Sequence, residues 1–505
     1  MMKINKRFFK KLCFATLTLT WAGCQNILEP DIQGQIPLET LLTTESGMLT
    51  AVNGMYAPLQ TMYKGSFQRL TDLASDDGWT WRNELEPDLF IAEPVFTHSQ
   101  NIWSTSYQGI ARTNTVLDNL DNVTDFSSEQ SRKNIEGQAR FLRAAYYFNL
   151  VRLFGGVPLI VRQIGSRTDA ELPRASIEEA YAQIKADLTD AYNLLPAAYG
   201  SGVGNEAGRP VNLSAAGLKT LVHLELGEWD EVIAAADLVI GKKTLQNNYA
   251  SYFDGSAENN QGTLFEVQYG GVDLATTSSL STFLAPTSTQ NGGAIILPTD
   301  DNLNGRGGGP SSGNGIVQAF ETGDLRKEVS LNSYNLPNFV DASKPAGSLF
   351  YIHKYYNTKD PNGRSTWNFP LIRYSEILLA KAEAMNERTF QVGGIALDLL
   401  NQVRVKAGLP ALPPAQVNTQ ESFRKALRNE RRVEFAFETK RYFDLNRWGI
   451  MENTMQPQLD FLALKFPAQR TVLHPITGKK YYLYPIPATE FINNAKLGQQ
   501  NPGYN

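Results

Sequence analysis

The sequence predicts a mainly α-helical protein built from antiparallel helical hairpins, with a loop-rich region containing short strands between them. Three observations predict this fold class. Apolar and small residues recur at steps of three and four through residues 127–160. Two helix–turn–helix patterns occupy residues 213–241 and 373–410. Residues 270–315 contain ten glycines, against 40 in all 505 residues, which predicts a long loop.

Residues 1–23 have the organisation of a secretory signal peptide. Five basic residues and no acidic residue precede the apolar run 12–22, which is too short to span a membrane as a helix. No later stretch of the sequence reaches the length of a spanning helix. Removing the signal leaves 42 basic and 51 acidic residues, a net charge of −9, which argues against a nucleic-acid partner.

Cys24 directly follows Ala22 and Gly23. Small residues before a cysteine resemble the lipobox of bacterial lipoproteins, in which the cysteine becomes the acylated first residue; Trp21 is an unusual residue there. Cys13 lies in the signal, so Cys24 is the single thiol of the remaining 482 residues. We expect a lipid on Cys24 to be the membrane attachment. The alternative is a plain cleaved signal followed by an inert cysteine.

Two helices follow a polar tether, residues 24–40, which Pro30 and Pro37 keep extended. The first is predicted over residues 45–63, and the second over residues 100–120. The apolar stripe of the first helix consists of Met48, Val52, Met55, Leu59 and Met62. The stripe of the second consists of Trp103, Tyr107, Ile110 and Leu117.

The stretch 127–160 predicts a long helix with its own start and stop signals. Ser127 and Gln130 can form a capping box, and Gly155 with Gly156 precedes Pro158. Its stripe consists of Ile135, Ala139, Leu142, Tyr146, Asn149 and Leu153. The adjacent Tyr146 and Tyr147 give it more than one face to pack, although an ordinary amphipathic core helix would show the same periodicity.

The helices that follow predict a repeat-like scaffold. A capping box of Ser176 and Glu179 starts one helix, which ends before Pro196. In 213–241, two helices meet at Gly227 and Trp229, and alanines allow them to approach closely. This unit and the one at 373–410 are similar to tetratricopeptide hairpins, with unrelated antiparallel helix pairs as the alternative.

Between the two hairpins the helical periodicity is interrupted. Alternating apolar residues in 263–269 predict a short strand, and residues 351–369 form an aromatic-rich irregular segment. Further along, residues 418–449 carry both charge signs with interleaved phenylalanines. They predict one helix laced with salt bridges and packed on others.

We find no sequence motif that indicates catalysis. The histidines after the signal are His98, His223, His353 and His474, and none has metalloprotease spacing; no nucleophile elbow or phosphate loop is present. His223 is interpreted as a packed residue of the first hairpin. Two-carboxylate glycosidase chemistry is not excluded by the sequence, but nothing indicates it. We therefore expect a non-enzymatic protein without a cofactor.

A calcium loop is half present at residues 300–305. Asp300, Asn302 and Asn304 fit its first half, but Ser311 stands where a bidentate glutamate is needed. A polar turn is the default interpretation of this segment, with a structural calcium ion as the alternative.

Residues 75–83, SDDGWTWRN, are the strongest candidate for a ligand site. Sugar recognition needs flat aromatic faces for the ring and short polar side chains for its hydroxyls. This segment lies between two predicted helices and combines two tryptophans with polar residues. The candidates are Asp76, Asp77, Trp79, Trp81, Arg82 and Asn83. Alternatively, the indoles form a small local core, and the two aspartates make a turn.

Several blocks of the chain, in this order, resemble the SusD-like, or RagB/SusD, family of Bacteroidota lipoproteins. They are RFLRAAYYFNLVRLFGGVPL, LPRASIEEAYAQI, LVHLELGEWDEVIAAADLVI, RYSEILLAKAEA, LNQVRVKAGLP, RNERRVEFAFETKRYFDLNRWG, YPIPATEF and QNPGY. The resemblance covers essentially the whole mature chain, with departures at Trp21 and in the glycine-rich run 305–315.

The resemblance implies a tetratricopeptide-like superhelix that packs on a SusC-like TonB-dependent outer-membrane barrel and captures glycan on a loop-rich face. It places Tyr269 and Phe283 on that face, with Trp367 as a weaker candidate. We then expect one domain over 41–505, with helical scaffold at about 41–241 and 371–450 and the ligand region at about 242–370.

The resulting hypothesis is a lipid-anchored cell-surface protein that captures an oligosaccharide or polysaccharide and passes it to the outer-membrane transporter. Peptide capture on the same scaffold is the first alternative, because a cleft flanked by backbone groups also accepts extended chains. A repeat scaffold for protein–protein interaction is the second.

Overall fold

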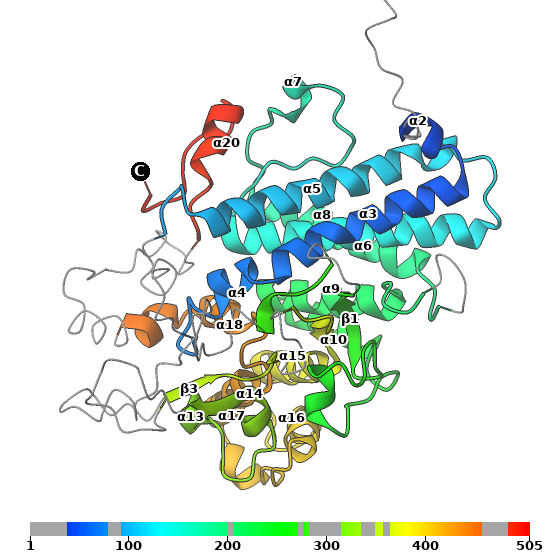
Figure 1. The fold of residues 1–505 in the computed structure, drawn as a ribbon. Helices are drawn as coiled ribbons and strands as arrows, with labels where there is room; N and C mark the ends of the chain where they lie inside the picture. The colour runs from blue at the N-terminus through cyan, green and yellow to red at the C-terminus, as the bar shows by residue number, and fades with distance from the viewer. Residues whose placement is uncertain are drawn as a thin grey trace, which may run out of the picture. The chain divides into compact units, whose positions relative to one another are not determined.

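The computed structural model describes residues 38–78, 92–199, 206–270, 276–281, 315–334, 349–356, 364–456 and 483–504. The chain divides into a short first unit, Met1–Leu41, and a second unit, Leu42–Asn505. The first unit contributes the one-turn helix α2, Leu38–Leu41. All the following elements belong to the second unit (Figure 1).

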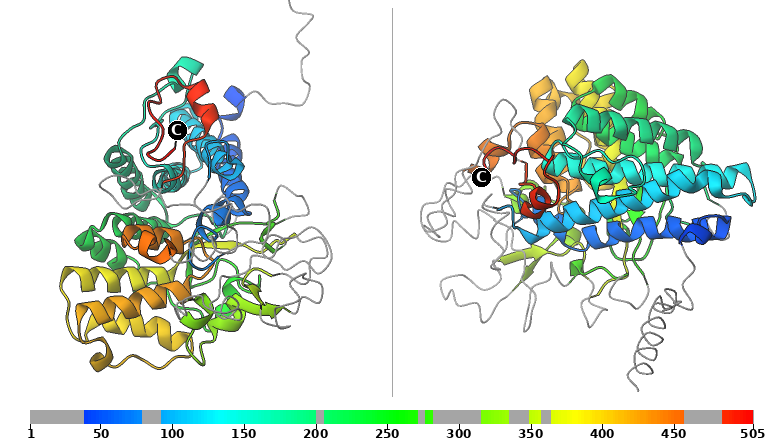
Figure 2. Two further views of the ribbon diagram at one scale, coloured as in Figure 1. Left: turned by 90° about the vertical axis from the view of Figure 1, so that its left-hand side faces the viewer. Right: turned by 90° about the horizontal axis from the view of Figure 1, so that it is seen from above.

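The second unit begins with a series of antiparallel helices (Figures 1 and 2). α3 (Glu45–Tyr63) packs against α5 (Thr97–Asn119), α5 against α6 (Glu129–Phe154), and α6 against α8 (Ile177–Leu194). The short α4 (Ser66–Thr71), the 3-10 turn η2 (Leu120–Asn122) and α7 (Arg167–Ala170) lie in the connections. The five apolar residues predicted to form the stripe of the 45–63 helix are all buried.

The two predicted hairpins continue this series. α9 (Asn212–Leu226) packs on α8 and pairs with α10 (Trp229–Asp237) around Gly227, whose φ of 68° is left-handed. α15 (Tyr374–Arg388) and α16 (Ile395–Lys406) form the second hairpin, and α15 packs directly on α10. The predicted mainly helical, hairpin-based architecture is therefore confirmed.

Two small antiparallel sheets stand beside the helices. β1 (Thr263–Val267) pairs with β4 (Phe369–Arg373), and β2 (Leu331–Tyr334) pairs with β3 (Leu349–Ile352). The predicted strand at 263–269 is confirmed, but its partner β4 was not foreseen. The remaining short elements are η3 (Tyr249–Tyr252), α13 (Ile316–Ala319), α14 (Arg326–Ser330), η4 (Pro414–Val417) and α20 (Ala488–Asn493).

The helix ends confirm one predicted capping box and correct another. Ser176 Oγ accepts from the Glu179 amide at 3.0 Å, and the Glu179 carboxylate accepts from the Ser176 amide at 2.8 Å. The long helix α6 instead has Ser128 as its cap, accepting from the Ser131 amide at 3.0 Å. Ser127 is not the cap because its hydroxyl donates to Glu45 of α3 at 3.0 Å.

The single helix predicted over 418–449 is in fact two. α17 (Gln420–Glu434) and α18 (Arg441–Arg447) are separated by a turn in which Phe437 and Thr439 both have a φ of 64°. Side chains from elsewhere in the chain bind carbonyl groups that helical bonds would otherwise occupy. Lys354 Nζ donates to the Ala436 carbonyl at 2.8 Å, and Arg373 Nη2 donates to the Glu434 carbonyl at 2.7 Å. Tertiary hydrogen bonds therefore replace the continuation of the helix.

Candidate functional site

Segments predicted to form the ligand face converge at the C-terminal end of α3. Tyr269 Oη donates to the Gln60 carbonyl at 2.9 Å, and Ser279 Oγ donates to the Lys64 carbonyl at 2.5 Å. The 276–281 segment is joined to residue 365 by a two-way backbone bridge, with N···O distances of 2.7 and 2.8 Å. Residues distant in sequence are thus assembled on one helical end.

Tyr269 anchors this assembly from the inside. Its side chain is 7% exposed, and its hydroxyl is engaged with α3. Burial raises the pKa of Tyr269 well above its ordinary value, so the hydroxyl stays protonated as a donor. The structure therefore gives Tyr269 a packing role in place of the predicted ligand contact.

Of the two predicted aromatics that the structure describes, Trp367 is the one left partly accessible. Its indole lies directly over Gly255, where an added Cβ would stand 2.3 Å from Trp367 Cδ1. Gly255 also has a φ of 70°, so glycine is required there for both space and backbone conformation. The neighbouring residues Asp254, Ser256 and Glu258 are exposed. A half-buried aromatic ring with short polar neighbours is the arrangement that a sugar ring needs.

A network of side-chain amides and carboxylates fixes the strand ends beneath Trp367. Asn368 Nδ2 donates to Glu266 Oε2 and to Gln268 Oε1, each at 3.0 Å, and Asn368 Oδ1 accepts from the Tyr269 amide at 2.9 Å. The Asn368 amide donates to Glu258 at 2.8 Å. Sequence reasoning missed these residues, although the polar positions of the β1 strand offered a signal.

Asp76 and Asp77 form a clamp with two arginines of the C-terminal region. Arg441 Nε and Nη2 donate to the two oxygens of Asp76 at 2.8 and 2.9 Å, and Arg432 Nε donates to Asp77 Oδ1 at 2.7 Å. Although burial opposes ionisation, Arg432 and Arg441 lower the pKa of Asp76 to about 2.

The clamp corrects the predicted role of the two aspartates. Asp77 is buried and the Asp76 side chain is 11% exposed, and guanidinium groups pair with both carboxylates, so the two aspartates hold the chain. The next residue, Gly78, has no room for a side chain, because an added Cβ would stand 2.3 Å from the carbonyl oxygen of Asp72. The chain entering the tryptophan-bearing segment is therefore rigidly positioned.

Other predicted site residues lie outside the described residues. They are Trp79, Trp81, Arg82, Asn83 and Phe283, the half calcium loop at Asp300, Asn302 and Asn304, and the lipidation candidate Cys24. Among the residues that the structure describes, no group of three or more His, Cys, Asp or Glu side chains could hold a metal ion.

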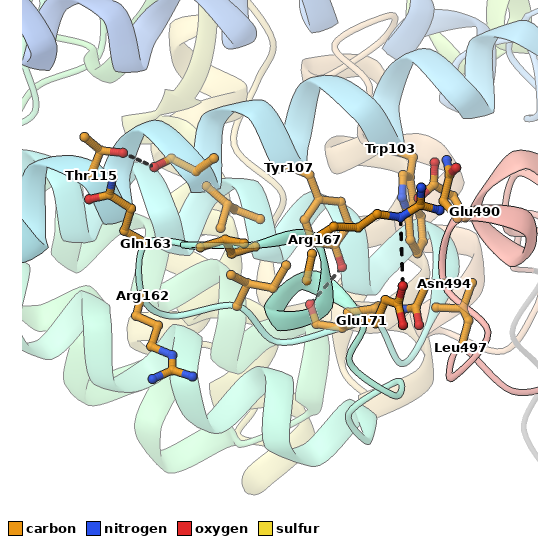
Figure 3. A pocket seen from close by; sticks show the side chains of 17 residues that line it. Trp103, Tyr107, Thr115, Arg162, Gln163, Arg167, Glu171, Glu490, Asn494 and Leu497 are labelled. Carbon is orange, nitrogen blue, oxygen red and sulfur yellow. Dashed lines mark hydrogen bonds and ion pairs between the residues drawn. The ribbon is translucent and has the colours of Figure 1, made fainter. Parts of the chain in front are cut away.

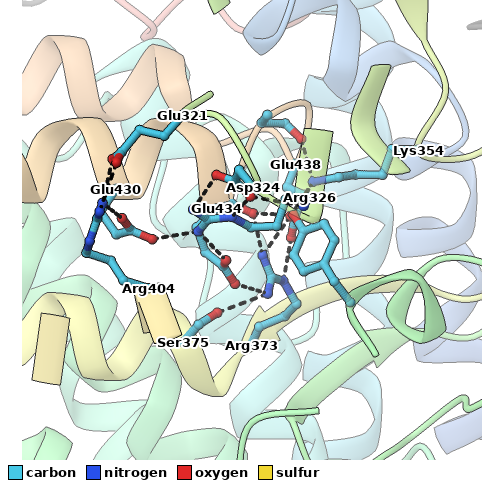
Figure 4. A network of polar contacts seen from close by, with 12 residues as sticks. Glu321, Asp324, Arg326, Lys354, Arg373, Ser375, Arg404, Glu430, Glu434 and Glu438 are labelled. Carbon is cyan, nitrogen blue, oxygen red and sulfur yellow. Dashed lines mark hydrogen bonds and ion pairs between the residues drawn. The ribbon is translucent and has the colours of Figure 1, made fainter. Parts of the chain in front are cut away.

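A buried ionic cluster joins β4 to α17 and to the turn after it (Figure 4). Arg326 and Arg373 lie between the carboxylates of Glu434, Glu430 and Glu438, at 2.6–3.0 Å. The cluster also contains Asp324, Lys354, Ser375, Arg404 and Glu321. It confirms that the charged stretch 418–449 is laced with salt bridges and packed against other elements; of the acids in the cluster, Glu321 alone is exposed, at 47%.

Burial shifts the protonation equilibria within and beside this cluster. The pKa of Lys354 falls to about 8, because burial disfavours its charge more than Glu438 stabilises it. Burial raises the pKa of Asp72 to about 8, against the hydrogen bond from the Thr439 amide. Both side chains are inaccessible, so these shifts reflect packing and not a reactive group.

Comparisons with known sequences decide the family. Residues 330–504 match the family described as "SusD family", and residues 29–216 match one described as "Starch-binding associating with outer membrane". The chain belongs to the SusD/RagB family. SusD-family members are non-catalytic binding proteins, so this chain is a binding protein and not an enzyme. The second description associates the family with the outer membrane.

SusD relatives match along nearly their whole length. SusD-like protein P2 of Formosa agariphila is 27% identical over 98% of this chain and 99% of the relative. A SusD-like protein of Bacteroides ovatus is 22% identical over 87% of this chain and 82% of the relative. In the described part of the chain, no helix combines the length and apolar character needed to cross a bilayer.

Solved SusD-like structures share the fold. A laminarin-binding SusD-like protein superposes with a TM-score of 0.71 at 23% identity, covering 92% of this chain and all of that one. Surface glycan-binding protein A of Bacteroides uniformis gives a TM-score of 0.73 at 23% identity, covering 91% of this chain and 99% of that one. The tetratricopeptide-like class predicted for the scaffold is confirmed.

Proposed function

We propose that this SusD-family protein captures an oligosaccharide at the cell surface and passes it to a TonB-dependent outer-membrane transporter. The single observation that carries the proposal is the half-buried Trp367 indole over Gly255, flanked by short polar side chains. Two structural neighbours are named for glycan binding, one of them for laminarin.

The proposed contacts are Trp367 together with Trp79, Trp81, Arg82, Asn83 and Phe283. One aromatic stack contributes on the order of 1 kcal/mol beyond area burial, so several rings must act together. The clamp at Asp76 and Asp77 would set the start of the tryptophan segment, and the bridge at residue 365 would fix the approach to Trp367. Anchorage through lipid on Cys24 and docking on a SusC-like barrel are part of the same proposal.

Affinity gel electrophoresis against a panel of polysaccharides tests the proposal. We expect at least one polymer to retard the soluble protein that starts after Cys24. Replacing Trp79 and Trp81 together by alanine should abolish the retardation, and Trp367→Ala should weaken binding roughly fivefold, the loss of one stack. Thermal unfolding of the Trp79/Trp81 variant should change little.

Trp229→Ala is a matched control, because this partly buried indole lies on the α10 hairpin and is not among the proposed glycan contacts. It should leave retention unchanged. If the Trp79/Trp81 variant and the Trp367 variant both retained the polymer as well as the Trp229 variant does, the proposed glycan face would be refuted.

A further inference from the structure

A cavity of about 540 Å³ lies between α5, the segment 158–171 and the C-terminal segment that carries α20 (Figure 3). Pockets that hold small organic ligands measure roughly 300–1,000 Å³, so this cavity has the size of a binding site. Its lining residues come from different parts of the chain than the residues proposed to contact glycan.

The walls of the cavity are held in place by hydrogen bonds to backbone carbonyls. Tyr107 Oη donates to the Pro158 carbonyl at 2.8 Å, and Asn114 Nδ2 donates to the Ile160 carbonyl at 3.0 Å. On the opposite side, Asn494 Nδ2 donates to the Leu172 carbonyl at 2.7 Å. The irregular segment 158–171 is thus fastened to a long helix and to the C-terminal wall. The cavity is preformed, which lowers the entropic cost of filling it.

The floor of the cavity is apolar. It is made by aliphatic side chains and by the faces of Trp103 and Tyr107, whose ring centroids lie 5.2 Å apart. The aliphatic contributors are Ile110, Ala111, Pro158, Ile160, Ile164 and Leu497. Water gains few hydrogen bonds on such a surface, so a ligand with an apolar body is favoured there.

The end of the cavity where Trp103 lies carries both signs of charge. Figure 3 shows Arg167, Glu171, Glu490 and Asn494 gathered at the end where Trp103 lies. Arg167 Nε stands 3.9 Å from Glu171 Oε1, a distance that leaves both groups able to bind another partner. Burial raises the pKa of Glu490, even though the Trp103 indole donates a hydrogen bond to it.

The presence of both signs of charge determines which polar groups of a ligand can bind at this end. A charged group on the ligand would be attracted by the side chains of opposite charge and repelled by those of like charge. The repulsion would offset most of the favourable electrostatic energy. Hydroxyl groups both donate and accept, so they can bind the arginine, the amide and the carboxylates together. The chemistry that fits both ends is a neutral sugar joined to an aromatic or acyl group.

We infer that this cavity is a second ligand site, which takes a neutral glycoside with its aryl or acyl substituent against α5 and its hydroxyls toward Glu490 and Asn494. The site shares no residue with the proposed glycan face and does not depend on it. It would let the protein recognise a substituent that the backbone of a glycan does not carry.

Isothermal titration calorimetry with 4-nitrophenyl β-D-glucopyranoside tests the inference. Methyl β-D-glucopyranoside is the comparison ligand, because it has the same sugar without the aryl body. We expect saturable binding of the aryl glucoside, with the methyl glucoside at least about tenfold weaker. Equal affinities for the two glucosides, or no heat from the aryl glucoside, would overturn the inference with the wild-type protein alone.

Two cavity-filling variants test whether the aryl glucoside binds in this cavity. Ala111→Trp fills the cavity from α5, and Ala170→Trp fills it from α7; neither alanine is fully buried. Each variant should lower the affinity for the aryl glucoside at least about tenfold, and the double variant should abolish binding. Ala57→Trp is the matched control, since it adds the same ring to an exposed alanine of α3 and should bind as the wild type does.

The outcomes separate this site from the glycan face. Affinity for the aryl glucoside should be unchanged in the Trp79/Trp81 variant, and polysaccharide retention should be unchanged in Ala111→Trp. If the aryl glucoside were lost with the tryptophans and kept in Ala111→Trp, it would bind the glycan face, and the inference would be wrong. Unfolding midpoints close to the wild-type value show that a lost affinity is not caused by misfolding.

Discussion

Arg373→Met removes one of the fully enclosed cations of the buried ionic cluster. The Arg373 side chain is 1% exposed and donates five hydrogen bonds, to Ser375, to the Glu434 carboxylate and carbonyl, and to both oxygens of Glu438. Methionine has a similar volume, so the substitution removes charge and hydrogen bonds while leaving little empty space.

Removing one partner of a buried ion pair costs about 3–5 kcal/mol, because the remaining charge stays buried without compensation. Glu434 and Glu438 would each keep one cation, Arg326 at 3.0 Å and Lys354 at 2.8 Å. We therefore expect Arg373→Met to lower the free energy of unfolding by about 3 kcal/mol, the lower end of that range.

Urea unfolding followed by far-ultraviolet circular dichroism measures this loss. Arg388→Met is the matched control, because Arg388 and Asp230 pair at 2.6 Å with 56% and 68% of their side chains exposed. An exposed pair contributes about 0–1 kcal/mol, so the control should unfold nearly as the wild type does. In the Arg373→Met background, carboxylates outnumber the remaining cations of the cluster, so Glu438→Gln should recover part of the loss by removing one negative charge.

The reasoning fails if Arg373→Met and Arg388→Met unfold at the same urea concentration. It also fails if Glu438→Gln, added to Arg373→Met, costs as much as it does in the wild type. Either result would mean that the enclosed charges are solvated or paired in another way.

Two further predictions concern a buried acid and the anchor. Asp72→Asn keeps the acceptor for the Thr439 amide, 2.9 Å away, but cannot ionise. Because burial raises the pKa of Asp72 to about 8, the folded protein holds a proton there that the unfolded chain releases near pH 4, so the wild type loses stability as pH rises from about 4 to 8. Urea unfolding should show the variant gaining at least about 1 kcal/mol over the wild type between pH 5 and pH 8, and parallel pH profiles would contradict this account. Cys24→Ser should move the protein from the membrane fraction to the medium of the cells, and an unchanged membrane fraction on immunoblotting would exclude the lipid as the attachment.

The helical scaffold could be predicted because its signals are local. The 45–63 helix was predicted with its observed bounds, since the Met48 to Met62 stripe and the surrounding breaks lie within one short window. The Ser176 capping box and the turn at Gly227 also need only neighbouring residues. Periodicity and caps determine such elements before any tertiary contact forms.

The errors have a common physical cause in long-range contacts. The break at Phe437 depends on Lys354 and Arg373, which bind carbonyls more than sixty residues away in the sequence. Asp76 and Asp77 looked like exposed turn residues because their arginines are more than 350 residues distant. A pattern in one window cannot show a partner outside it.

The candidate site was only partly accessible to sequence reasoning for the same reason. The family resemblance pointed to Tyr269 and, more weakly, to Trp367, but it could not separate a ring over Gly255 from a ring buried under α3. The amides around Asn368 are individually ordinary, and their common position appears only when β1 and β4 pair.

The buried ionic cluster also determines when the C-terminal half can fold during synthesis. Its cations at positions 326, 354, 373 and 404 are synthesised before the acids at 430, 434 and 438 that neutralise most of them. A ribosome-bound fragment ending ahead of residue 430 would have to bury Arg373 and Lys354 without counter-ions, which is strongly unfavourable. The C-terminal half therefore stays unfolded until its final third has been synthesised. A chain that is still unfolded can pass through a translocation pore.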